Sequence, residues 1–265
     1  MVHRRAFSFT DDSVNVKPDI SLNERSFAAS YPALQLLRLR KLQSAAYQRL
    51  YLSNHMAWEN PWPFISMSFS GMRSWAEHLP DTINSSLKWL LLSELNCGCI
   101  LILCAPALTR KPSDYANALT FEHAVQYADC MISLTQVTDQ SALYTSHDVL
   151  RASYVGDRFL DVLEAEGTWI MTGVPPAPPI LLSGSSPLPL VHCRSVGGLI
   201  DQALSCLKRL EQVLEHLCIR YEYPEPLNDF RARSMGALRI LDMRPEVYPS
   251  RHGLVPGSLQ IRKEN

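Results

Sequence analysis

The sequence has no excess of charge of either sign. Lys and Arg together number 25 and Asp and Glu 26, so the formal net charge of the 265 residues is −1. Binding to a nucleic-acid backbone depends on cationic side chains that release counterions, so the balance excludes a chain that wraps nucleic acid by bulk charge. We therefore expect no direct DNA binding by this chain, although the composition allows a local basic patch.

The sequence also lacks the short motifs of common enzyme classes. It contains no hydrolase nucleophile elbow, no phosphate-binding glycine loop, no dinucleotide fingerprint and no HExxH zinc motif. The eight histidines stand singly, with no pair three or four residues apart as a helical metal site would need. We predict that the chain is not an enzyme and that it holds no metal or other cofactor.

The seven cysteines follow no disulfide pattern. Their odd number and their position inside apolar segments favour a reducing compartment. On a helix of 3.6 residues per turn Cys97 and Cys99 point about 200° apart, so the two cannot chelate one ion, whereas Cys97 and Cys104 share a face. A metal site and a group of buried thiols are the two interpretations of this cluster, and the second is favoured because free cysteine is usually buried.

Long hydrophobic runs are missing as well. The most membrane-like stretch, 95–108, has fourteen residues and is interrupted by Asn96, Gly98 and Pro106. Crossing a bilayer takes about 20 apolar residues, so this stretch predicts a buried core helix and no membrane contact. The two arginines at the N-terminus are not followed by an apolar region, so we expect no secretory signal peptide.

Helical periodicity covers most of the chain. It predicts helices over 30–55, 75–106, 113–132, from Ser141 or Ser146 to Met171, over 200–217 and over 227–243. The second of these is expected to have a break and cap at Pro80-Asp81, and the fourth to end at Gly173. Pro61 and Pro63 predict a loop at 60–63. Residues 1–30 are expected to be extended and 244–265 to form a loose tail. No strand-like alternation is found, so we predict an all-α fold, an irregular helical bundle over 31–243.

The segment 174–189 stands apart because it holds six of the 18 prolines. Proline-rich segments stay extended without a packed partner, so this segment predicts a linker or an excursion loop between two helices. At its end, His192 and Cys193 could form a nucleophile pair or could simply lead into the next helix. The second interpretation is favoured because catalytic pairs usually come from distant parts of a sequence.

Three further patterns each have two interpretations. Asp161, Glu164 and Glu166 could perform acid–base chemistry or form a solvated helix face, and the second is favoured. A basic run could bind phosphate or an acidic partner, or it could form a solvated helix face, and the second is again favoured. The run consists of Arg38, Arg40, Lys41 and Arg49. The apolar stripe over 200–217 could be a coiled-coil seam or a core-facing helix, and its short length favours the core.

Several segments, in consistent order, resemble the fungal-specific transcription factor domain, the middle homology region of fungal binuclear zinc-cluster regulators. The helix over 37–51 is similar to that family's LRLRxIQSxIYxxLY helix. The segments 3–18, 87–106, 121–128 and 203–230 resemble further motifs of the family. We interpret the matching positions as structural, namely Leu37, Leu39, Gln43, Tyr47, Cys206 and Phe230.

The resemblance implies an all-α regulatory domain of a nuclear transcription regulator, of a kind common in secondary-metabolite gene clusters. The family binds DNA through a six-cysteine zinc cluster, but this chain has no cysteine before Cys97. We therefore expect a chain that starts inside the regulatory domain, carries no zinc cluster and acts through protein partners or a partner regulator chain. The alternative is a helical interaction or scaffold module without a transcriptional role.

Two consequences concern ligands and partners. If the domain senses a small-molecule effector, we expect its pocket between the helix over 95–108 and the helices that carry Phe121 and Trp169, because such sites lie between packed helices.

A regulatory domain without its first helices should also leave apolar faces uncovered, around Leu37, Leu42 and 87–92. We expect that these faces lead to self-association or require a partner chain.

Overall fold

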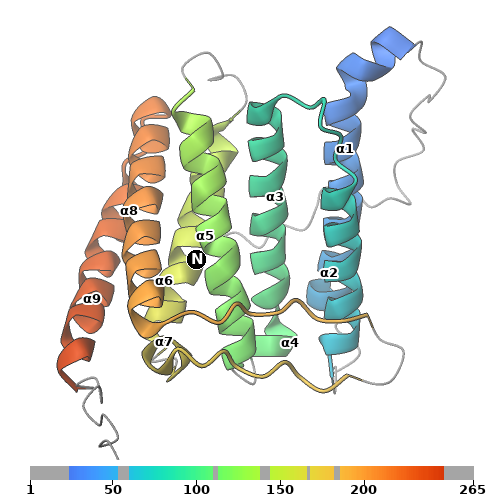
Figure 1. Cartoon of the computed structure of the whole chain (residues 1–265). Helices are drawn as coiled ribbons and strands as arrows, with labels where there is room; N and C mark the ends of the chain where they lie inside the picture. The colour runs from blue at the N-terminus through green and yellow to red at the C-terminus, as the bar shows by residue number, and fades with distance from the viewer. Residues whose placement is uncertain are drawn as a thin grey trace, which may run out of the picture.

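The computed structural model describes residues 24–52, 60–109, 113–137, 144–165, 168–181 and 186–247, and these residues form a bundle of helices (Figure 1). The described residues contain no strand, which confirms the all-α prediction. The elements are α1 (Glu24–Tyr47), a π-helical turn η2 (Gln48–Leu52), α2 (Trp62–Glu77), α3 (Ser85–Leu103), α4 (Pro106–Thr109), α5 (Asp114–Thr135), α6 (Ser146–Glu164), α7 (Thr168–Thr172), α8 (Val196–Arg220) and α9 (Glu225–Val247).

Side-chain caps set the start of several helices. Ser113 caps α5 as predicted, since its hydroxyl accepts a hydrogen bond from the Ala116 amide. Ser195 caps α8 in the same way. The cap of α3 is Asn84 and not Asp81, so the predicted break near Pro80 is right but its cap was misplaced. Such caps satisfy amide groups that the first turn of a helix leaves without a partner.

Some predicted helix boundaries are wrong. α1 begins at Glu24, so residues 24–30 are helical and not extended, and α9 continues to Val247, so 244–247 belong to a helix and not to the tail. α2 begins at Trp62, inside the predicted loop, because Pro63 lies in the first turn, where a missing amide proton is tolerated. Residues 1–23, 53–55 and 248–265 of the predicted segments lie outside the described residues.

The helix predicted to end at Gly173 is two helices. α6 ends at Glu164, and the short α7 follows from Thr168 to Thr172. The end at Gly173 is confirmed, and its φ of 68° explains the residue type, because the left-handed region is unfavourable for side chains with a Cβ.

Two hydrophobic clusters make up the core, and α3 contributes to both. Cys97 and Ile100 belong to the cluster formed with α5, α6, α8 and α9, whereas Leu91, Cys99 and Ile102 belong to the cluster formed with α1 and α2. Figure 1 shows the same order, with α3 between the α1–α2 pair and the remaining helices. α3 is the one described helix long and apolar enough to cross a membrane, and its burial between two clusters accounts for its hydropathy.

The apolar stripe of α8 faces the larger core cluster. Ala203, Leu207, Leu210, Leu214 and Leu217 are all buried there. The core-facing interpretation of this stripe is therefore confirmed for this chain.

The proline-rich segment leaves the bundle after α7, runs toward α2 and returns to α8 (Figure 1). Its described residues, 174–181 and 186–189, are not helical. The returning arm is held by hydroxyl groups of the bundle, because Ser66 donates to the carbonyl of Ser186 and Tyr115 donates to that of Pro189. Leu188 is buried beside them in the smaller core cluster.

The apolar faces that were expected to be exposed, around Leu37, Leu42 and residues 87–92, are exposed only in part. Leu37 is 42% exposed, but Leu42 packs against the smaller cluster and Leu91 is buried in it.

Candidate functional site

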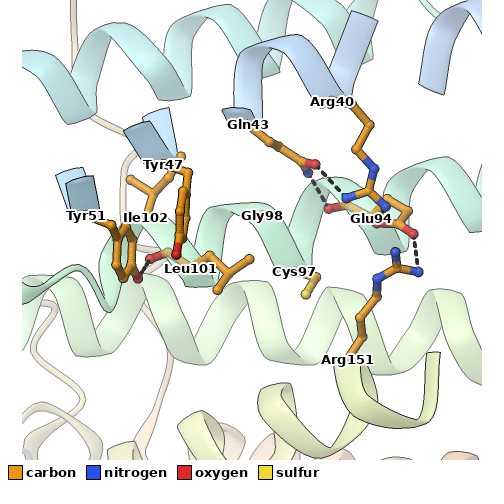
Figure 2. A pocket seen from close by; sticks show the side chains of 10 residues that line it. All are labelled: Arg40, Gln43, Tyr47, Tyr51, Glu94, Cys97, Gly98, Leu101, Ile102 and Arg151. Atoms are coloured by element: carbon orange, nitrogen blue, oxygen red, sulfur yellow. Dashed lines mark hydrogen bonds and ion pairs between the residues drawn. The ribbon is translucent and has the colours of Figure 1, made fainter. Parts of the chain in front are cut away.

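A buried carboxylate joins three helices at the centre of the bundle. Glu94 of α3 is 6% exposed, and its two oxygens are divided between two arginines (Figure 2). Arg40 of α1 lies 2.7 Å from Oε2, and Arg151 of α6 lies 2.6 Å from Oε1. Arg151 also contacts Asp148 at 2.7 Å, so two cations and two carboxylates balance one another. We call these four residues together with Gln43 the polar node.

Gln43 completes the polar node from α1. Its Nε2 donates to the backbone carbonyl of Glu94 at 2.8 Å, and its Oε1 accepts from Arg40 at 3.0 Å. A glycine in α3 makes this position possible, because a Cβ at Gly98 would lie 2.3 Å from Nε2 of Gln43. The amide therefore occupies the space that any larger residue at position 98 would take.

A small cavity of about 80 Å³ lies beside the polar node, between α1 and α3. At its far end Tyr47 and Tyr51 stack with ring centroids 4.7 Å apart, and the hydroxyl of Tyr51 donates to the carbonyl of Leu101 (Figure 2). Leu101 and Ile102 supply apolar wall. Since a water molecule occupies about 30 Å³ in the liquid, the cavity has room for only a few waters or a very small apolar group.

Burial dominates the electrostatics of the node. It raises the pKa of Glu94 above its ordinary value of 4.5, although Arg151 and Arg40 favour the charged form. Burial also raises the pKa of the neighbouring Cys97 thiol to about 12, with a further contribution from the Glu94 charge. A thiol in this state is protonated and a weak nucleophile. The polar groups of the node are satisfied by one another, so the arrangement joins α1, α3 and α6.

One polar atom near the node has no partner. The hydroxyl of Tyr127 on α5 is buried without a hydrogen bond among the described residues. Its pKa is raised well above the ordinary value, mainly by burial and also by the charges of Glu94 and Asp148.

The two residues proposed to line an effector pocket lie in contact. Phe121 and Trp169 meet edge to face with ring centroids 5.3 Å apart, and both are buried in the larger core cluster. Neither lines the cavity beside the polar node. An effector bound between them would have to separate two packed rings. It could then accept a hydrogen bond from the indole nitrogen of Trp169, which is buried without a partner among the described residues.

The six positions singled out by the resemblance differ in environment. Leu39 and Gln43 are buried and Tyr47 lines the cavity, whereas Leu37 is exposed. Cys206 and Phe230 are buried in the larger core cluster, far along the chain from the polar node.

Glu94, Asp148 and Arg151 are the node residues that the sequence analysis missed. Glu94 is the one acidic residue in the apolar sequence of α3. A single carboxylate in such a helix is a signal for a buried ion pair, because an unpaired charge is rarely buried.

The acidic face of α6 contributes to a surface ion-pair network. Arg233 of α9 contacts Asp157, Asp161 and Glu164 at 3.0, 2.9 and 3.1 Å. Glu166, the third residue of the acidic face predicted from the sequence, lies outside the described residues. The carboxylates described here therefore join two helices, and this pairing accounts for them without acid–base chemistry.

His192 and Cys193 turn to different partners. The imidazole Nδ1 of His192 lies 2.8 Å from the carboxylate of Glu122, and the His192 amide donates to the same side chain at 3.0 Å. The Cys193 thiol lies 3.9 Å from the carbonyl of Gly173. This geometry favours the structural interpretation of the pair.

The remaining alternatives concern metal and the basic run. The described residues contain no group of three or more His, Cys, Asp or Glu side chains that could hold a metal ion. The basic run is divided, since Arg40 enters the polar node and Arg49 lies 5.2 Å from the centre of the Phe64 ring.

Comparison with known proteins gives no match. No family model, no curated protein and no solved structure is significantly similar to this chain.

Proposed function

We propose that the chain is an all-helical regulatory domain of a nuclear transcription regulator, which acts through protein contacts and not through DNA contacts of its own. The proposal begins from the resemblance of residues 37–51 to a helix of the fungal-specific transcription factor domain. The chain's net charge of −1 and the absence of cysteine before Cys97 support the second part.

One observation carries the proposal. Four polar and aromatic positions of the family-like segment lie on one side of it and face α3, namely Arg40, Gln43, Tyr47 and Tyr51. Arg40 and Gln43 hold Glu94, while Tyr47 and Tyr51 line the cavity beside it. An exposed face of a helix would tolerate many residues at these positions. Here each side chain has a specific contact, so the most distinctive part of the resemblance coincides with the most distinctive polar site of the described structure.

A tethering experiment tests the proposal. The full chain is fused to a heterologous DNA-binding domain, and the output of a reporter gene is compared with that of the DNA-binding domain alone. We expect the fusion to raise or lower reporter output and a fluorescent fusion of the chain to accumulate in the nucleus. The variant Gly98→Ala, which forces Gln43 out of the polar node, should lose the effect.

The matched control is Gly236→Ala. A Cβ at this exposed position in α9 would meet no atom within 4 Å. This variant should keep the reporter effect. A stable, folded and nuclear fusion that leaves the reporter unchanged would overturn the transcriptional role.

The second candidate function is a helical interaction module without a transcriptional role. It is favoured by apolar side chains on the outer surface of α8 and α9, where Ile219, Met235 and Leu238 are exposed. Exposed apolar side chains on two neighbouring helices are candidates for a protein contact surface. A chain that binds a protein partner and has no effect on the reporter would support this function.

A further inference from the structure

The outgoing arm of the proline-rich segment has an unusually restricted backbone. Residues 174–180 read Val-Pro-Pro-Ala-Pro-Pro-Ile. Each proline fixes its own φ near about −65°, and the residue before a proline is kept out of the helical region. These restrictions favour the polyproline II helix, which has about three residues per turn and no internal hydrogen bonds.

The period of three divides the arm into edges that differ in exposure. Val174, Ala177 and Ile180 share one edge and are all exposed, with Ile180 94% exposed. Pro178 is exposed on the second edge, next to a half-buried Pro175. Both residues of the third edge, Pro176 and Pro179, are half-buried. One edge is therefore fully accessible and the second is accessible at Pro178. Together the two edges carry the pairs Val174-Pro175 and Ala177-Pro178 at a spacing of three.

The bundle holds the arm at both ends. At one end the Gly173 amide donates to the carbonyl of Trp169 at 2.9 Å, and a Cβ at Gly173 would lie 2.8 Å from the carbonyl oxygen of Arg194. At the other end Leu181 packs against the smaller core cluster. An arm that is already extended and fixed loses little conformational entropy when it binds, which favours association.

The chemistry of the arm limits its partner. Residues 168–193 contain no Asp, Glu, Lys or Arg, so a charged groove would gain nothing from this segment. None of the described backbone–backbone hydrogen bonds involves residues 174–181. The carbonyl oxygens of the arm are thus available to donors such as an indole N–H or a phenol O–H, and the proline rings are available to aromatic faces.

We propose that residues 174–180 are a docking segment for a protein domain with an uncharged, aromatic-lined groove of the kind that recognises polyproline II ligands. The exposed side chains Val174, Ala177 and Pro178 insert between aromatic rings, and the anchors at Gly173 and Leu181 keep the arm on the bundle. This proposal does not depend on the transcriptional role, because it rests on the exposure, charge and backbone of the arm alone.

The test uses the full chain, labelled with a fluorophore, on an array of recombinant WW, SH3 and EVH1 domains. We expect saturable binding to domains with uncharged aromatic grooves, with a Kd tighter than about 1 mM. Ala177→Asp and Ile180→Asp should each weaken it by about tenfold or more, because an unpaired carboxylate would be buried against aromatic rings.

The matched control is Leu190→Asp, on the returning arm of the same segment, where the side chain is 80% exposed. It adds the same charge to the same uncharged run and should leave binding unchanged. Circular dichroism of the three variants should be that of the wild type, since all three positions are exposed. Absence of binding across the array, or equal losses for Ile180→Asp and Leu190→Asp, would overturn the proposal.

Discussion

The contact between Gly98 and Gln43 predicts that Gly98→Ala destabilises the wild-type protein but stabilises a variant in which Gln43 is replaced by Ala. In an ordinary helix interior, Gly→Ala stabilises by about 0.5–1 kcal/mol because glycine has more backbone freedom to lose. Here the three atoms nearest to a new Cβ all belong to the Gln43 side chain, at 2.3, 2.9 and 3.0 Å. The side chain is flexible, but it is buried and held by hydrogen bonds to Glu94 and Arg40, so it cannot move without losing them.

The magnitudes decide the outcome in the wild-type background. Overpacking of a buried site destabilises by about 1–3 kcal/mol, and loss of a typical hydrogen bond adds about 1 kcal/mol. These terms exceed the gain in helix propensity. We expect Gly98→Ala to lower the free energy of unfolding by about 1–3 kcal/mol, whereas the unobstructed control Gly236→Ala should raise it by about 0.5–1 kcal/mol.

Removing the obstructing side chain should invert the sign. Gln43→Ala deletes the three atoms that meet the new Cβ. In that background Gly98→Ala should stabilise by about 0.5–1 kcal/mol, the value of the propensity alone. Urea unfolding, followed by circular dichroism, measures the stability of the four proteins of this double-mutant cycle, which are the wild type, the two single variants and the double variant. If Gly98→Ala destabilises equally in both backgrounds, the contact with Gln43 is not the cause and the reasoning is refuted.

Three further predictions concern packing, protonation and thiol reactivity. Gly156→Ala should destabilise by about 1–3 kcal/mol in urea unfolding, because its Cβ would lie 2.9 Å from the buried ring of Phe230, and Phe230→Leu should relieve the loss. The raised pKa of Glu94 means that its carboxylate binds a proton more readily in the native state than in the unfolded chain. The stability of the wild type relative to Glu94→Gln should therefore decrease as pH rises above 4.5, which a series of unfolding curves at different pH values measures. Alkylation at neutral pH followed by mass spectrometry should modify Cys193, the exposed thiol, before the buried thiols, and equal labelling of all of them in the folded chain would contradict the burial described here.

Local signals in the sequence were sufficient for much of the fold. Ser113 was recognisable as a cap because a short hydroxyl side chain before a periodic segment satisfies free amides. The buried stripe of α8 followed from spacing alone. The start of α2 was missed because proline at the first turn and proline in a loop look the same in a sequence, and only the packing of Trp62 and Phe64 against the core distinguishes them.

The polar node could be predicted only in part. Arg40 was visible as a member of a basic run and Gln43 as a position of the family-like helix. Their common partner Glu94 lies 54 and 51 residues away in the sequence, and no local pattern encodes that pairing. The signal that was available, a single carboxylate in an apolar helix, predicts that some cation is near but does not identify it.

The position of the polar node suggests what it contributes. α3 divides its apolar side chains between the two core clusters, and hydrophobic contacts alone would tolerate small shifts of α1 along it. A buried ion pair adds little net stability, because desolvation opposes the attraction between the charges, but removal of one partner is strongly unfavourable. Glu94 is paired from both sides at once, by Arg40 of α1 and Arg151 of α6. A shift of either helix would take from the buried Glu94 carboxylate one of its two cationic partners. This cost favours one alignment of the α1–α2 pair with the rest of the bundle.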